Sequence, residues 1–183
     1  MHKVSGNIRQ SLLSTGFTGA VLAIAFFFSG FTASAQQFDI VQVNDSLWNL
    51  TLTIDGKVAS TWQLNYPVYR FATTDINGDG SVDAVVGVFK GSRYFKAPSR
   101  RVFVFKNFRG DIRPLWLGSR LGGELVDFTV TDDGKVRAIE KNSRGSFEVS
   151  DYSWHGFGLG FDAHVATCKT VHDCYQFLYS LIF

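Results

Sequence analysis

Apolar and polar residues alternate along several short segments of this chain, a pattern that predicts half-buried β-strands. The first such segment, Leu47–Ile54, is followed by a turn at Asp55–Lys57 and by a second strand at Val58–Leu64. The Asp-Gly pair in this turn supplies the positive φ angles of a tight β-hairpin. A second hairpin of the same kind is predicted between Leu125 and Lys141, around the turn that contains Asp133.

Other short apolar runs, bounded by turn residues, extend this pattern. They are Tyr69–Thr73, Ala84–Phe89, Val102–Phe105 and Ser146–Trp154. Long stretches with helical periodicity are absent before residue 162. Residues 36–161 are therefore predicted to form an all-β domain, with short antiparallel hairpins in blade-like sheets of the β-propeller type.

Internal similarity favours such blades. The segment "RVFVFKNFRGD" from Arg101 aligns with "VRAIEKNSRGS" from Val136 at a shift of about 35 residues, a period typical of propeller blades. Residues 36–161 hold only about three such units, whereas closed propellers have ~4–8 blades. Two alternatives follow. Either another copy of the chain completes the ring in a homo-oligomer, or the propeller is incomplete and its sheets pack face to face.

Residues 1–35 have the pattern of a secretory signal peptide. Lys3 and Arg9 give a basic start, an apolar core runs from Ala20 to Phe31, and small residues end the segment at Ala33–Ala35. A membrane anchor is the alternative, but a spanning helix needs roughly 20 apolar residues and this run is shorter. We expect cleavage after this segment, a secreted or periplasmic protein, and no membrane span in the mature chain.

The net charge of the mature chain argues against two classes of partner. Without Lys3 and Arg9, the 18 basic residues of the full chain fall to the number of acidic residues, 16. Nucleic acids and anionic membrane surfaces attract proteins through clustered Lys and Arg, and only Ser99–Arg101 forms a local basic cluster. We therefore expect no nucleic-acid partner.

Residues 162–183 form a C-terminal tail of different character, and a short helix is one interpretation of it. Its apolar side would consist of Val171, Cys174, Phe177, Leu178 and Leu181. The chain has two cysteines, Cys168 and Cys174, and in an exported protein we expect them to form a disulfide. The last apolar residues are expected to cover a sheet edge or to dock on a partner.

Oxygen-bearing residues recur at alternate positions just before the predicted strand at Ala84–Phe89. Asp75, Asn77 and Asp79 are followed by Ser81, whose backbone carbonyl is a further ligand candidate, and by Asp83. Calcium prefers six to eight oxygen ligands of this kind. A metal-free turn rich in Asp and Asn is the alternative. The carboxylates would then repel one another, so the sequence favours bound calcium as the cofactor.

The context of this loop distinguishes it from an EF-hand, which needs a glutamate at position twelve and a helix afterwards. Position twelve is Val86 here, and β-branched residues follow. The segment Tyr69–Asn107 resembles the FG-GAP or VCBS-type repeat of integrin-like β-propellers. It has the same order of a strand, a D-x-N-x-D-G-x-x-D loop and a second strand. The resemblance implies a calcium-stabilised hairpin in an extracellular binding scaffold. The ligands that it implies are Asp75, Asn77, Asp79, Ser81 and Asp83.

No catalytic group is predicted. Glu124 and Asp127 are three apart, so on an alternating strand they face opposite sides. Asp151, Ser153 and His155 share a face of one strand, but neighbours there are roughly 6.6 Å apart and cannot converge. An enzyme is therefore less favoured than a binding protein.

The predicted function is an exported, calcium-stabilised binding or adhesion module for a protein or glycan partner. Arg93, Tyr94 and Phe95 lie in a long connection between two strands, and an aromatic-plus-arginine composition is typical of binding hot spots. Two alternatives stay open: a secreted glycoside or ester hydrolase whose site is assembled from distant residues, and a self-assembling structural subunit.

Overall fold

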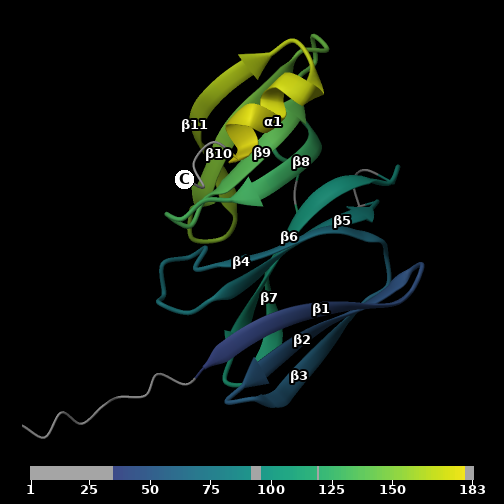
Figure 1. The fold of residues 1–183 in the computed structure, drawn as a ribbon, viewed down its shortest axis with the longest axis vertical. Coiled ribbons are helices and arrows are strands. Elements are labelled where there is room, and N and C mark those ends of the chain that lie inside the picture. The colour runs from purple at the N-terminus through teal and green to yellow at the C-terminus, as the bar shows by residue number, and fades with distance from the viewer. Residues whose placement is uncertain (1–34, 92–95, 119, 180–183) are drawn as a thin grey trace, which may run out of the picture. The chain divides into compact units, whose positions relative to one another are not determined.

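The computed structural model describes residues 35–91, 96–118 and 120–179. In these ranges the chain forms 11 β-strands and one short α-helix (Figure 1). The strands form three antiparallel sheets, each built from strands that follow one another along the chain. This organisation confirms the all-β prediction. The predicted signal segment, residues 1–35, lies outside the described residues except for Ala35.

The first sheet has three strands and the middle sheet has four. The first consists of β1 (Gln36–Asn44), β2 (Leu47–Ile54) and β3 (Lys57–Leu64). The middle sheet consists of β4 (Val68–Thr74), β5 (Asp83–Lys90), β6 (Ser99–Phe108) and β7 (Asp111–Leu117).

The C-terminal sheet has four strands and carries the helix. Its strands are β8 (Glu124–Val130), β9 (Val136–Lys141), β10 (Phe147–Trp154) and β11 (Leu159–Cys168), and the helix is α1 (Val171–Tyr179). The tail predicted from residue 162 is therefore part strand and part helix, because β11 crosses that boundary. β11 pairs along the full length of β10, which orders residues 162–168 as an edge strand.

The middle sheet is buried on both faces, which explains the uninterrupted apolar run in β5. Ala84, Val86 and Val88 contribute to one core with the first sheet, while Val85 contributes to a second core with the C-terminal sheet. In β6 the side chains divide in the same alternating way between the two cores. A strand that is buried on both sides needs apolar residues at every position.

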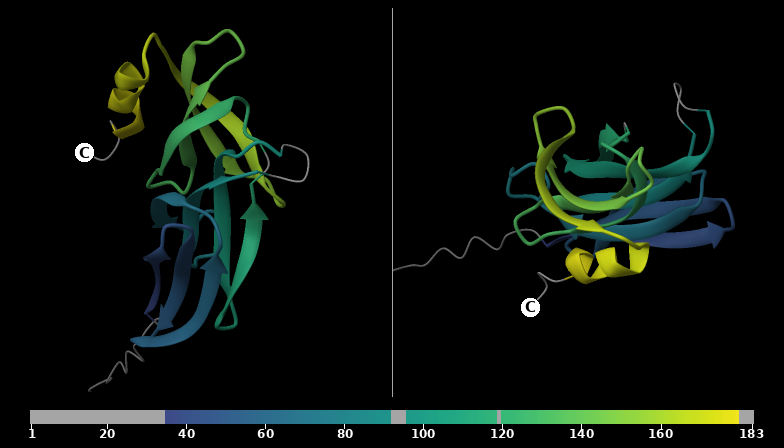
Figure 2. Two further views of the ribbon diagram at one scale, coloured as in Figure 1. Left: turned by 90° about the vertical axis from the view of Figure 1, so that its right-hand side faces the viewer. Right: turned by 90° about the horizontal axis from the view of Figure 1, so that it is seen from above.

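Helix α1 packs on one face of the C-terminal sheet rather than on its edge (Figure 2). Cys174 and Leu178 are its buried residues, and they join a third core with Ile139 and Val149 of the sheet. The spacing of Cys174 and Leu178 places both on one side of the helix. Cys174 and Leu178 therefore cover a sheet face, whereas Leu181 and the other residues after Tyr179 lie outside the described residues.

Three strands were not predicted from the sequence: β1, β7 and β11. Their residues are mostly exposed or half-buried, so their apolar pattern is weak. β7 also contains Pro114, which cannot donate a backbone hydrogen bond and is tolerated because β7 is an edge strand. Edge strands gain their order from the neighbouring strand, and the one-dimensional pattern does not contain that information.

The turns explain most of the internal similarity. Asp55 and Gly56 both have positive φ angles, as the predicted tight hairpin requires. The repeated Lys-Asn-x-Arg-Gly segments form the β6–β7 and β9–β10 turns, where Asn107 and Asn142 accept backbone hydrogen bonds. β6 is the third strand of its sheet and β9 is the second. The similarity thus reflects shared turn chemistry and not equivalent blade positions.

Candidate calcium-binding site

The candidate calcium loop connects β4 to β5, and Asp75 organises its backbone. The Oδ1 atom of Asp75 accepts hydrogen bonds from the backbone amides of Gly78 at 2.8 Å and Asp79 at 3.1 Å. Its Oδ2 atom accepts a third from Gly80 at 2.8 Å. Gly78 and Gly80 have positive φ angles, which curl the chain around this carboxylate.

Asn77 and Asp79 continue the curl with short-range bonds. The backbone amide of Asp79 donates to Asn77 Oδ1 at 2.9 Å, and the Asn77 side-chain amide donates to Asp79 Oδ2 at 3.0 Å. The amide of Ser81 donates to Asp79 Oδ1 at 3.0 Å. These contacts are the local side-chain-to-backbone bonds that Asp and Asn form in turns.

Asp83, the first residue of β5, differs from the other loop aspartates because it is completely buried. Its Oδ2 accepts a hydrogen bond from the amide of Ile76 at 3.2 Å, while its Oδ1 is buried without a partner among the described residues. Burial, and to a lesser extent the charges of Asp79 and Asp75, raises the pKa of Asp83 to about 7. The charge of Lys106 has the opposite, smaller effect, and Asp83 forms no ion pair with any described residue.

The loop therefore offers a buried ligand for a cation, but its carboxylates are not gathered as they would be around a bound metal. The unpartnered Asp83 oxygen is a buried ligand that a hard cation would satisfy. Among residues 35–91, 96–118 and 120–179, no three Asp, Glu, His or Cys side chains are gathered closely enough to hold a metal. Asp75 directs both oxygens to backbone amides. Calcium binding thus requires exchange of some of these bonds for metal ligation.

A turn from the C-terminal sheet supports the loop, and the sequence analysis missed this contact. A Cβ atom on Gly134 would lie 2.4 Å from the backbone oxygen of Asp75, so only glycine allows this approach. Gly134 follows Asp133 in the β8–β9 turn. The Asp-Gly motif was visible in the sequence, but a turn motif carries no information about which distant loop it contacts.

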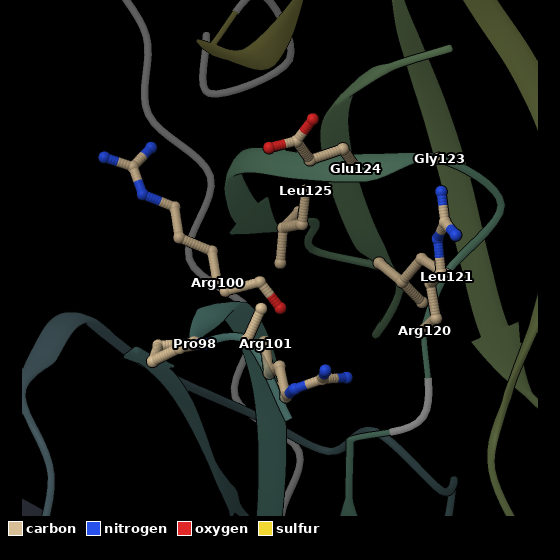
Figure 3. Close-up of a pocket in the computed structure, with 10 residues that line it drawn as sticks. Pro98, Arg100, Arg101, Arg120, Leu121, Gly123, Glu124 and Leu125 are labelled. Carbon is tan, nitrogen blue, oxygen red and sulfur yellow. The ribbon is translucent and has the colours of Figure 1, made fainter. Parts of the chain in front are cut away.

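The predicted partner-binding residues Arg93, Tyr94 and Phe95 lie outside the described residues. The chain on the C-terminal side of them borders a cavity of about 310 Å³ (Figure 3). Arg100, Arg101, Arg120 and Glu124 provide its charged lining, with Leu121 and Leu125 among its apolar residues. Arg100 donates a hydrogen bond to the carbonyl of Val126.

No protein-family model and no curated protein sequence matches this chain. The likeness to FG-GAP and VCBS-type repeats thus rests on the loop and its flanking strands. Within the described part of the chain, no helix is sufficiently long and apolar to cross a membrane.

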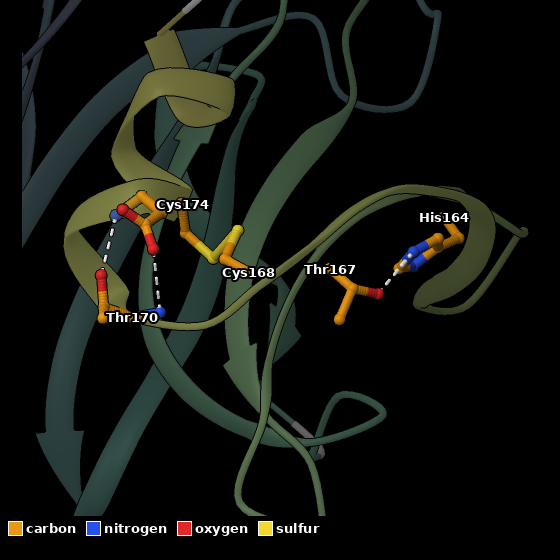
Figure 4. The surroundings of a disulfide bond; sticks show 6 residues. His164, Thr167, Cys168, Thr170 and Cys174 are labelled. Carbon is orange, nitrogen blue, oxygen red and sulfur yellow. Dashed lines mark hydrogen bonds between the residues drawn. A yellow bond between two sulfur atoms is a disulfide. The ribbon is translucent and has the colours of Figure 1, made fainter.

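The disulfide prediction is confirmed, since Cys168 and Cys174 are bonded (Figure 4). The bond joins the end of β11 to α1. Thr170 lies between the two cysteines and directly precedes the helix. The hydroxyl of Thr170 accepts from the Asp173 amide at 3.2 Å, and the Asp173 carboxylate accepts from the Thr170 amide at 3.1 Å. This reciprocal pair is a capping box.

Of the residues considered for catalysis, Asp151 has a partner outside the trio. Asp151 bonds to Arg137 through both carboxylate oxygens, at 2.7 and 2.8 Å. His155 contacts Ser153 at 3.4 Å and is exposed. No bond between Asp151 and His155 is found among the described residues. The spacing argument was wrong for Ser153 and His155, whose side chains meet. The full trio does not form, because Asp151 is bonded to Arg137 instead.

The alternation argument for Glu124 and Asp127 was wrong, because a β-bulge lies between Leu125 and Asp127. A bulge adds one residue and shifts the faces of the strand. The carboxylate of Asp127 is bonded to other groups than Glu124: it pairs with Arg70 and accepts a hydrogen bond from Tyr175 at 3.1 Å.

Proposed function

We propose that this chain is a calcium-stabilised binding module that is exported and recognises a protein or glycan partner. One observation carries the proposal: Asp83 is fully buried at the end of an acidic loop, with one carboxylate oxygen unpartnered among the described residues. Buried carboxylates ordinarily have a cationic or hydrogen-bonding partner. A calcium ion would be that partner.

The residues that would hold the ion are Asp75, Asn77, Asp79, the Ser81 carbonyl and Asp83. Calcium supplies positive charge and flexible oxygen coordination, and takes no part in a reaction here. Its charge would offset the repulsion among the three carboxylates. Asp83 begins β5, so the same ion would fix the start of that strand. The resemblance to FG-GAP and VCBS-type repeats supports this role.

The partner surface is proposed at the connection between β5 and β6. Calcium would anchor β5 at Asp83, and the opposite end of β5 leads into this connection at Lys90. Arg93, Tyr94 and Phe95 remain the predicted contact residues within it. The cavity beside Pro98–Arg101 supports recognition at this end of the sheet, because binding sites for small groups are concave.

Calorimetric titration of the purified, chelator-treated chain with calcium tests the first half of the proposal. One ion should bind to the wild type, and Asp79→Ala and Asp83→Asn should weaken this binding at least about tenfold. Asp111→Asn removes an exposed carboxylate elsewhere and should bind calcium like the wild type. Equal calcium affinity in all four proteins would refute the site.

Binding to an array of immobilised glycans, with and without calcium, tests the second half. Tyr94→Ala should reduce retention on the array while leaving calcium affinity unchanged. Asp79→Ala should reduce both. If Tyr94→Ala and Arg93→Ala leave retention unchanged, the recognition surface lies elsewhere in the chain.

A further inference from the structure

Arg101 is a buried residue whose guanidinium has no carboxylate partner in the described part of the chain. Only 5% of this residue is exposed, and its one hydrogen bond to described residues runs from Nε to the carbonyl of Lys90, at 3.0 Å. Arg137 is equally buried but is paired with Asp151, and Arg70 is paired with Asp127. The terminal nitrogens of Arg101 are not among the buried atoms without a partner, so they are accessible in the cavities that the residue lines. The contrast with the paired arginines marks Arg101 as a cation that can receive an anion from outside the chain.

The described residues offer no substitute. All 16 Asp and Glu residues lie in the described ranges, and none forms an ion pair with Arg101. The side chain of Arg101 also points away from Glu124, the acidic residue that lines the adjoining cavity (Figure 3).

A second cation lies on the same face of the middle sheet. Arg101 pairs with Val88 across β5 and β6, and Lys90 is two residues beyond Val88, so the alternation of side chains places Lys90 and Arg101 together. Both line a cavity of about 400 Å³, and no acidic side chain is among its lining residues. Two like charges in one cavity attract an anion.

Aromatic rings form the walls of this cavity. Trp62, Tyr66 and Phe103 line it, and the Nζ atom of Lys90 lies 4.5 Å from the centre of the Tyr66 ring. Burial raises the pKa of Tyr66 to about 12, so its hydroxyl is neutral and does not repel an anion. A flat group could pack against these rings while its charge reaches the two cations.

We propose that this cavity binds a ligand with a carboxylate attached to a six-membered ring, with Arg101 and Lys90 contacting the carboxylate and the aromatic walls contacting the ring. A cavity of this size accommodates one such ring. A uronic acid unit of a glycan and an aromatic acid both have this chemistry. The inference rests on the proposed binding function, whose ligand it specifies, and does not depend on calcium.

Isothermal titration of the full chain with sodium glucuronate, sodium benzoate, glucose, benzyl alcohol and sodium acetate tests the proposal. Glucuronate or benzoate should bind at least about tenfold more tightly than its neutral counterpart, because a charge-assisted bond to the carboxylate is lost. The tighter of the two acids identifies the source of the ring. Acetate should bind more weakly than both, because it lacks the ring.

Two variants connect the binding to the cavity. Arg101→Met keeps a side chain of similar length without its charge and should weaken binding at least about tenfold. Lys90→Met changes an exposed residue, so we expect this variant to fold like the wild type. It should weaken ligand binding several-fold. Lys57→Met is the control. It removes an exposed cation at the first residue of β3, whereas Trp62 of the cavity lies near the other end of that strand, and it should bind the ligand like the wild type.

Equal affinity for charged and neutral ligands, or wild-type binding by Lys90→Met and folded Arg101→Met, would overturn the proposal. Acetate binding as tight as glucuronate and benzoate binding would overturn the role of the ring. All titrations are run in excess chelator and repeated in calcium. Ligand binding in chelator, without any calcium affinity, would refute the calcium proposal and leave this one intact.

Discussion

Asp83 and Asp151 are both buried aspartates on interior strands, yet their surroundings differ. Asp151, in the C-terminal sheet, is held by both arms of the Arg137 guanidinium. Asp83, in the middle sheet, accepts one bond from a backbone amide, and its other oxygen has no partner among the residues that the structure describes. In both places, removing the carboxylate from water costs free energy. The C-terminal sheet compensates this cost with its own arginine. In the middle sheet Asp83 forms no ion pair with a described residue, and we propose calcium from solution as its cation.

The C-terminal sheet and the calcium loop are also held in place by different interactions. The C-terminal sheet is joined to α1 by the Cys168–Cys174 bond, which is independent of solution conditions other than redox potential. The loop before β5 is held by hydrogen bonds to Asp75 and by the approach of Gly134. We therefore expect the stability of the middle sheet, and not that of the C-terminal sheet, to respond to calcium.

The largest effect is expected from removing Arg137. Arg137→Leu leaves Asp151 buried without its cation, which should lower the free energy of unfolding by about 3–5 kcal/mol in urea denaturation. The double variant Arg137→Leu/Asp151→Leu removes both charges and should recover most of this loss. If the single variant lost less than about 1 kcal/mol, Asp151 would tolerate isolation and the contrast with Asp83 would disappear.

Calcium should have the next largest effect. At a free concentration of about 100 times the dissociation constant, calcium should raise the free energy of unfolding of the wild type by about 2.7 kcal/mol. Asp83→Asn should show no such increase. In chelator, Asp83→Asn should be at least as stable as the wild type, because it removes a buried charge that forms no ion pair with a described residue. A large loss in chelator would show that the protein itself compensates Asp83.

Asp151→Asn is the matched control for Asp83→Asn. It removes the same charge from the other region, but leaves Arg137 buried without its anion. It should therefore be less stable than the wild type with and without calcium. The clearest outcome of the comparison, in chelator, is a change in the free energy of unfolding of opposite sign for Asp83→Asn and Asp151→Asn.

Loss of the disulfide should have a smaller effect. The two cysteines are separated by 6 positions, and replacing both with alanine should lower the free energy of unfolding by about 2 kcal/mol, because the unfolded chain regains entropy. The increase produced by calcium should be the same in this variant as in the wild type. A smaller increase would indicate that α1 and the calcium loop are coupled.

The smallest effect is expected at the surface. Asp111 and Arg113 form an exposed ion pair at 3.6 Å. Asp111→Ala should change the free energy of unfolding by less than about 0.5 kcal/mol, because water already solvates both groups. A change comparable to that of Arg137→Leu would mean that burial does not explain the difference between the regions.

The sequence alone determined the elements whose signal is local. The alternation in Leu47–Ile54 predicted β2 with its observed bounds, and the Asp-Gly pair predicted the turn after it. The compartment argument predicted the disulfide. The spacing of Asp75, Asn77, Asp79 and Asp83 identified the loop as a calcium candidate, and that assignment stays a prediction.

The tertiary structure decided everything that depends on distant neighbours. β11 is a strand because it pairs with β10, and α1 covers a sheet face because Ile139 and Val149 needed cover. Which aspartate has an arginine could not be read from the order of residues, since Arg137 and Asp151 meet across paired strands and Arg70 reaches Asp127 from another sheet. Arg101 is distinctive for the same reason. Burial and pairing are properties of the folded chain, and only the fold shows that its charge lies in a cavity without a carboxylate.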